Sequence, residues 1–122
     1  HEAGDQVLTT VANRLTECVR ENDTVARLGG DEFTVIVAGA EQYRDVERVA
    51  QKILAAIKQP LLIALKPVQI SASIGISSYP QSASTPNTLL DAADQAMYTA
   101  KKAGTNRMCF YNPDNEIDIQ PS

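Results

Sequence analysis

Apolar side chains recur at the spacing of an α-helix in three segments of the chain and predict three helices. The first segment runs from Asp5 to about Arg20, and Asp5, which follows Gly4, is a natural N-cap. The second runs from Glu41 to about Gln59 and carries a continuous apolar stripe. The third begins at Thr85-Pro86 and ends before Gly104, with two lysines in its last turn.

Four other segments have the composition or the alternation of β-strands. Thr24–Leu28 and Phe33–Ala38 are separated by four residues, which favours an antiparallel hairpin. Phe33–Ala38 is apolar on both faces, as expected of a buried central strand. Val68–Ser77 alternates between apolar and small or polar residues, which predicts one buried face. Arg107–Tyr111 is a short last strand.

Two segments are less regular. Leu61–Pro67 suggests a small irregular hairpin, and the polar tail from Asn112 is either loose or forms an edge strand at Glu116–Gln120. The order helix, strand, strand, helix, strand, helix, strand favours an α+β fold, with helices packed on one face of a largely antiparallel sheet. A ferredoxin-like βαββαβ unit needs one more strand before the first helix, and the sequence contains none.

Composition and charge narrow the possible functions. A chain of 122 residues can form one domain with a real core. The net charge of −4 gives no basic field for a nucleic-acid partner, and no apolar run reaches membrane-spanning length. Cys18 and Cys109 lie far apart in sequence and are interpreted as free thiols in a reducing compartment. One His and two Cys offer no zinc constellation.

The connection of the predicted hairpin carries the most informative motif. Gly29–Phe33 reads Gly-Gly-Asp-Glu-Phe, which resembles the signature of the GGDEF family, the diguanylate cyclases. Arg20 and Asp23 form an Arg-x-x-Asp motif placed five residues ahead of the glycines, where that family has its inhibitory site. Further matching stretches, HEAGDQVL, SASIGIS and AADQAMYTAKKAGTNR, extend the resemblance over roughly Glu2 to Tyr111.

The resemblance implies a fold and a reaction. The fold would be a nucleotidyl-cyclase type of ferredoxin-like antiparallel sheet with packed helices, here lacking its first strand. The reaction would join two GTP molecules through 3′–5′ linkages into cyclic di-GMP and release two pyrophosphates. Because one domain holds one GTP, catalysis would need a homodimer. Magnesium or manganese would neutralise phosphate charge and align the reactants.

The resemblance also implies roles for individual residues. Asp31 would be the metal ligand and proton acceptor, and Glu32 would assist it. Gly29 and Gly30 have no side chains, so that a ribose and base could approach the backbone closely. Asp5 would accept hydrogen bonds from the guanine edge, and Lys101 would reach the terminal phosphates as a point charge.

Arg20 and Asp23 would bind cyclic di-GMP and produce feedback inhibition. The arginine could donate two hydrogen bonds to a guanine edge or a phosphate, and the aspartate could accept hydrogen bonds from guanine.

Simpler roles stay open for each of the residues assigned to the two sites. The turn could carry only solvated acids, Asp5 could be only an N-cap, and Lys101 could only complement the helix dipole. Arg20 and Asp23 could form a surface ion pair of little energetic value.

Two departures from the family pattern affect these expectations. Thr105 stands where many members carry an arginine, and it brings no charge to the phosphates. The family's first strand and following helix, which supply a second metal-binding aspartate and an asparagine for guanine, have no counterpart before the first helix. We therefore expect an N-terminally truncated domain at 1–111 with a tail at 112–122, in which Phe33–Ala38 has an unpaired edge. We expect this fragment alone to be inactive.

The leading hypothesis is a diguanylate cyclase domain from a bacterial cytoplasmic signalling protein, with regulatory domains elsewhere in the parent chain. No nucleic acid and no direct membrane insertion are expected, although the parent could be membrane-anchored. Two rival hypotheses remain. One is a non-catalytic GGDEF domain that binds cyclic di-GMP or GTP as a regulatory module. The other is a plain dimerisation module, which only the lack of the first strand supports.

Overall fold

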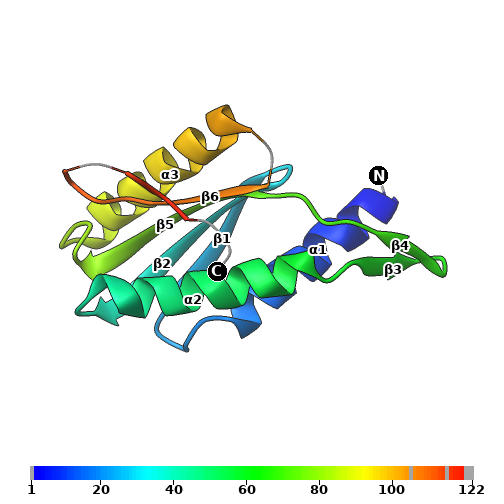
Figure 1. The fold of residues 1–122 in the computed structure, drawn as a ribbon, viewed down its shortest axis with the longest axis horizontal. Coiled ribbons are helices and arrows are strands. Elements are labelled where there is room, and N and C mark those ends of the chain that lie inside the picture. Colours follow the sequence, from blue (N-terminus) through cyan, green and yellow to red (C-terminus); the bar gives the residue numbers. More distant parts are fainter. Residues whose placement is uncertain (1, 105, 115, 120–122) are drawn as a thin grey trace.

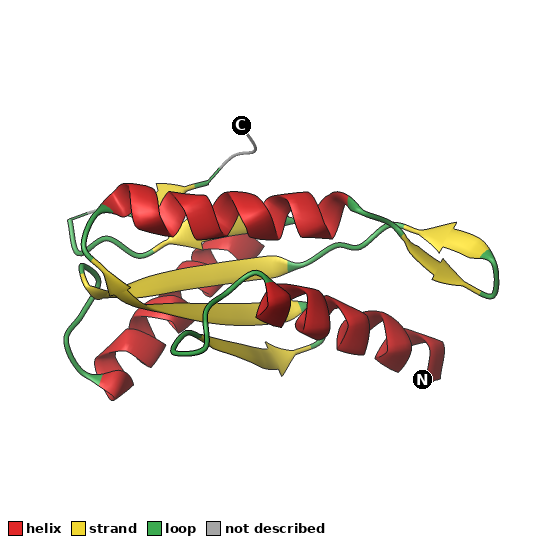
Figure 2. Ribbon diagram, turned by 90° about the horizontal axis from the view of Figure 1, so that it is seen from below, coloured by secondary structure: helices red, strands yellow, loops and turns green. Residues whose placement is uncertain are grey.

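The computed structural model describes residues 2–104, 106–114 and 116–119. A mixed sheet forms the middle layer, with α3 on one face and α1 and α2 on the other (Figure 1). A separate two-stranded hairpin extends away from the layers, alongside the N-terminal end of α1 (Figure 2). The elements are α1 (Glu2–Glu17), β1 (Thr24–Gly29), β2 (Glu32–Ala40), α2 (Tyr43–Lys58), β3 (Leu61–Ile63), β4 (Lys66–Val68), β5 (Ser73–Pro80), α3 (Pro86–Ala103), β6 (Arg107–Phe110) and β7 (Ile117–Asp118).

The α+β class is confirmed, but the prediction that the helices cover one face of the sheet was wrong. The two faces of β5 show why. Ile74 and Ile76 belong to the apolar core shared with α1 and α2. On the opposite face a Cβ on Gly75 would lie 2.0 Å from the carbonyl oxygen of Ala93, and the Ser77 hydroxyl donates to the Leu89 carbonyl at 2.7 Å. The small residues of this strand therefore form a second buried face on which α3 packs closely.

The sheet has the strand order β1-β2-β5-β6-β7. β1–β2 and β6–β7 pair antiparallel, whereas β2–β5 and β5–β6 pair parallel. The prediction of a largely antiparallel sheet was therefore wrong for the two central pairs. Its physical reason is connectivity, because α2 and α3 each return the chain to the starting end of the sheet, as crossover helices do. The expected unpaired edge at Phe33–Ala38 is also absent, because β5 occupies that side of β2.

The helix ends follow the sequence signals at α3 but not at α1. Thr85 is the N-cap of α3 and its side chain accepts from the Thr88 backbone, while Gly104 is the C-cap with a φ of 136°. Helix α1 already includes residue 2, so Asp5 lies inside its first two turns and is not its N-cap. No helix in the described part of the chain combines the length and the hydrophobicity required to cross a bilayer.

The less regular segments also become defined. The small hairpin predicted at Leu61–Pro67 is confirmed as β3–β4, although β4 extends one residue further to Val68. The predicted strand Val68–Ser77 is divided, because residues 69–72 are not part of any strand. In the tail, β7 is an edge strand on β6, and Ile119 is buried in the main core, so this part of the tail is not loose. Gln120 lies outside the described residues.

Candidate functional site

The Gly-Gly-Asp-Glu segment forms a tight turn between β1 and β2. Gly29 pairs with Glu32, so only two residues separate the strands. Gly30 has a φ of 47°, a left-handed conformation that glycine adopts at little cost. Two contacts fix the backbone: Arg27 Nε donates to the Gly30 carbonyl at 3.1 Å, and Ser73 N of β5 donates to the Asp31 carbonyl at 2.9 Å. The turn is therefore a preorganised part of the sheet edge.

Lys101, at the end of α3, reaches this turn from a distant part of the sequence. Its Nζ forms a salt bridge with Glu32 Oε2. The lysine side chain is 51 % exposed and the glutamate side chain 22 %, so the pair lies at an open surface. The hydrogen bond to Glu32 raises the pKa of Lys101 above its usual value, and the charges of Glu32 and Asp31 act in the same direction. The structure thus brings together Glu32 and Lys101, which the sequence assigned to one site.

The donor set at the turn suits a hard divalent cation only in part. Asp31 and Glu32 offer carboxylate oxygens, the ligands that magnesium prefers. Within the described residues, no group of three or more His, Cys, Asp or Glu side chains gathers in a way that could hold a metal ion. The turn can therefore supply two carboxylates, and the remaining ligands would have to be substrate oxygens, water or residues outside this set.

Asp5 occupies a different place from the turn. It is exposed on α1 and lines a cavity of about 450 Å³ together with Leu62 and Ile63 of the β3–β4 hairpin. The lining of this cavity includes no residue of the Gly-Gly-Asp-Glu turn. Its simpler role as an N-cap is excluded by the position of the helix start. The guanine role of Asp5 stays a prediction.

Arg20 and Asp23 lie in the loop between α1 and β1. Asp23 Oδ2 accepts from the Arg20 backbone N–H and Oδ1 accepts from the Ala38 backbone N–H, both at 2.8 Å. No ion pair joins these two side chains within the described residues, so the surface-pair alternative was wrong. The Arg20 side chain lines a small cavity of about 150 Å³ with Gly39, Glu41 and other residues between β2 and α2.

The sequence did not reveal two contacts that shape the site. No role for Arg27 was predicted from the sequence, although its side chain fixes the turn. The only sequence signal for this contact was a cationic residue two positions before the first glycine. Ser73 appeared as one small residue in an alternating strand, and its backbone contact depends on the β2–β5 pairing. Thr105, the other position of interest, lies outside the described residues.

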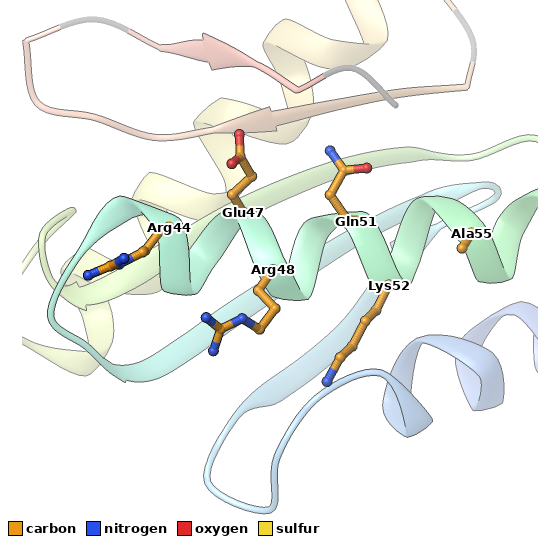
Figure 3. A pocket seen from close by; sticks show the side chains of 6 residues that line it. All are labelled: Arg44, Glu47, Arg48, Gln51, Lys52 and Ala55. Atoms are coloured by element: carbon orange, nitrogen blue, oxygen red, sulfur yellow. The ribbon is translucent and has the colours of Figure 1, made fainter. Parts of the chain in front are cut away.

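A surface depression of about 560 Å³ lies away from the turn. Its lining comes entirely from the exposed face of α2 and is dominated by long charged side chains (Figure 3). Its lining residues are Arg44, Glu47, Arg48, Gln51, Lys52 and Ala55. None of the site residues predicted from the sequence is among them.

Comparison with known proteins identifies the family. The family described as "Diguanylate cyclase, GGDEF domain" matches residues 1–107. The chain belongs to the GGDEF domain family. It is 42% identical over 120 residues to the bifunctional diguanylate cyclase/cyclic di-GMP phosphodiesterase MucR of Pseudomonas aeruginosa, covering 98% of this chain and 17% of MucR. It is 36% identical over 114 residues to the cyclic di-GMP phosphodiesterase PdeR of Escherichia coli, covering 93% of this chain and 17% of PdeR.

Solved GGDEF structures have the same fold. The isolated GGDEF domain of TpbB from Pseudomonas aeruginosa superposes with a TM-score of 0.78 at 42% identity, covering 92% of this chain and 66% of that one. The predicted resemblance to the GGDEF family is therefore confirmed. The chain spans about a sixth of the length of MucR and PdeR, which therefore contain much that this sequence does not.

Proposed function

We propose that the Gly-Gly-Asp-Glu turn is half of a GTP site and that the parent protein is a diguanylate cyclase. The observation that carries the proposal is the meeting of Glu32 with Lys101. A phosphoryl-transfer site needs a carboxylate for a metal and a cation for the terminal phosphates within a few ångströms of each other. Glu32 and Lys101, which are 69 positions apart in the sequence, supply this pair beside the family's signature turn.

Each side chain has a chemical role in this proposal. Asp31 holds magnesium or manganese and accepts the proton of the attacking 3′-hydroxyl, and Glu32 assists in holding the metal. The metal, when bound, neutralises the phosphate charge that develops during transfer. Lys101 contacts the terminal phosphates, and the bare backbone of Gly29 and Gly30 lets the ribose approach closely. Asp5 accepts from the guanine edge.

The site faces a second copy of itself in the active enzyme. Each 3′-hydroxyl attacks the α-phosphate of the other GTP, so two domains form a homodimer around the two nucleotides. The product, cyclic di-GMP, binds at Arg20 and Asp23 and holds the domains apart. The parent resides in the cytoplasm, in keeping with the free thiols Cys18 and Cys109.

A second candidate function is a regulatory module that binds GTP or cyclic di-GMP without catalysis. The observation that favours it is the set of only two carboxylates at the turn within the described residues. In addition, the relative PdeR is named as a cyclic di-GMP phosphodiesterase and not as a cyclase. The argument for a dimerisation module relied on an unpaired side of β2, and β5 pairs along that side.

The deciding experiment is a cyclase assay on the full-length parent protein with GTP and magnesium. Cyclic di-GMP should form, and Asp31→Asn should abolish it while Asp91→Asn, an exposed carboxylate on α3, leaves it unchanged. Absence of product from the wild type under these conditions, with GTP binding retained, would favour the regulatory module. Loss of product in both variants would contradict the assigned role of Asp31.

Feedback inhibition has its own test. Calorimetric titration with cyclic di-GMP should show binding to the wild type and at least about tenfold weaker binding to Arg20→Gln, because a charge-assisted contact is lost. Arg14→Gln serves as a control for charge elsewhere, because Arg14 contacts backbone carbonyls at the end of α2. Equal affinities of wild type and Arg20→Gln would remove the inhibitory site.

A further inference from the structure

A row of three residues crosses the sheet beside the turn. Glu32 of β2 is paired with Ser73 of β5, and Ser73 is paired with Arg107 of β6. Directly paired residues project from the same face of a sheet, and the neighbouring row of Phe33, Ile74 and Met108 lies in the core shared with α2. Glu32, Ser73 and Arg107 therefore project toward the α3 side, where Lys101 approaches.

Arg107 and Lys101 lie at the same end of α3. The chain leaves the helix at Gly104 and enters β6 at Arg107. A Cβ on Gly104 would lie 3.9 Å from Arg107 Nε, so the guanidinium side chain rests against the helix end. Two strand spacings, about 10 Å, separate the backbones of Glu32 and Arg107. A triphosphate held by Lys101 above Ser73 would be within reach of the arginine side chain.

We propose that Arg107 is a second phosphate-binding residue of the nucleotide site, and that Asp118 of β7 competes with the nucleotide for it. The inference rests on the proposed GTP site. A guanidinium binds phosphate oxygens with two parallel N–H donors, whereas the ammonium of Lys101 is a point charge. Arg107 thereby supplies the positive charge that the sequence does not provide at Thr105.

The competing contact is one that a phosphate can replace. Arg107 Nη1 and Asp118 Oδ2 are 3.1 Å apart, and their side chains are 41% and 43% exposed. An ion pair this exposed contributes little to stability, and a phosphate group carries more charge than a single carboxylate. The edge strand β7 thus sets how readily Arg107 is available to the nucleotide.

The experiment measures nucleotide affinity by calorimetry in the presence of magnesium. The probes are a GTP analogue with a non-hydrolysable α–β bridge and GMP, which lacks the outer phosphates. Arg107→Gln should weaken binding of the analogue about tenfold or more, without changing the binding of GMP. Asp118→Asn should strengthen binding of the analogue about two- to fivefold, the range expected from an exposed ion pair.

The matched control is Lys102→Gln, which removes one positive charge from the same helix end. The Lys102 ammonium lies 5.3 Å from the centre of the Tyr98 ring, so its loss should leave both affinities within about twofold of wild type. Arg107→Gln and Asp118→Asn break the same ion pair but should act in opposite directions on the analogue. If the ion pair had only a structural role, both variants would change the affinity for the analogue in the same direction, and the affinity for GMP would change in that direction too.

Three results would overturn the inference. They are equal analogue affinities for wild type and Arg107→Gln, shifts of the two variants in the same direction, and equal losses in Arg107→Gln and Lys102→Gln. If the wild type binds the analogue better than GMP in these experiments, the three results refute only the role of Arg107. The proposed GTP site is then retained. Failure of the wild type to bind the analogue at all refutes the proposed function, and this inference with it.

Discussion

Replacing Gly29 by alanine separates the demands of the fold from those of a ligand. A Cβ at Gly29 would have one neighbour within 4 Å, Glu32 Oε1 at 3.8 Å, which is an ordinary van der Waals contact. Among the glycines with positive φ are Gly30, Gly39 and Gly104, but not Gly29. The folded protein therefore has room for the methyl group and no backbone strain to resist it.

The expected change in stability is small and favourable. Alanine restricts the unfolded chain more than glycine, which at a compatible site is worth about 0.4–1 kcal/mol. The midpoint of thermal unfolding should therefore rise by roughly 1–5 °C. The same methyl group would stand where the proposed ribose approaches the backbone. Affinity for the GTP analogue should fall about fivefold or more, because overpacking a close contact costs of order 1–3 kcal/mol.

Differential scanning calorimetry and isothermal titration on one preparation give both values. A fall of several degrees in the unfolding midpoint would show that the geometry of the turn has been misjudged. An unchanged midpoint with unchanged affinity would show that the ribose does not approach Gly29. Only the combination of a preserved fold and weakened binding supports a glycine selected for its ligand.

Three other perturbations test particular contacts. Gly75→Ala should destabilise the protein by about 3 kcal/mol or more, because its Cβ would meet three backbone atoms of α3 at 2.0–2.7 Å, as denaturant unfolding would measure. Burial, and secondarily Asp91, raises the pKa of Asp94, so Asp94 opposes folding as the pH rises above the usual aspartate range near 4. Asp94→Asn should therefore unfold at a higher temperature than wild type at neutral pH, with a difference that shrinks toward pH 4. Asp23→Ala should cost about 1–3 kcal/mol because two backbone N–H groups lose their acceptor, whereas Arg20→Ala should leave the unfolding midpoint nearly unchanged.

Each of these expectations has a contrary result. A Gly75→Ala protein as stable as wild type would mean that α3 does not pack directly on β5. An Asp94→Asn advantage that grows toward acid pH would reverse the sign assigned to this partly buried carboxyl, whose buried Oδ1 has no hydrogen-bond partner among the described residues. Equal stability losses in Asp23→Ala and Arg20→Ala would show that the loop is held by the arginine side chain as well.

Local signals in the sequence were sufficient where local chemistry determines the structure. Thr85 and Gly104 mark the two ends of α3 because capping depends on a few neighbouring residues. The Gly-Gly connection predicts the hairpin for the same reason. Asp5 shows the limit of such signals, because an aspartate after a glycine is a good N-cap only if the helix begins there, and α1 begins earlier.

The remaining features depend on residues far apart in the sequence. Strict alternation in Val68–Ser77 predicts one buried face, but whether a helix covers the other face depends on how closely it can approach. Gly75 lets the backbone of α3 lie directly against β5, because a Cβ at this position would meet backbone atoms of the helix. The sequence around Gly75 does not show that a helix backbone is its neighbour. The Arg27, Ser73 and Lys101 contacts to the turn likewise require the finished sheet. Residue types at the site could therefore be predicted, but not which of them meet.

The two backbone hydrogen bonds of Asp23 affect how an Arg-x-x-Asp motif should be interpreted when it is found in other sequences. Its carboxylate ties the loop after α1 to β2, a duty that persists whether or not a product binds. A related domain without feedback control would still need the aspartate to hold this loop, but it could replace the arginine. The arginine of the motif is therefore the better indicator of cyclic di-GMP binding. An aspartate without the arginine indicates only that the loop is held in place.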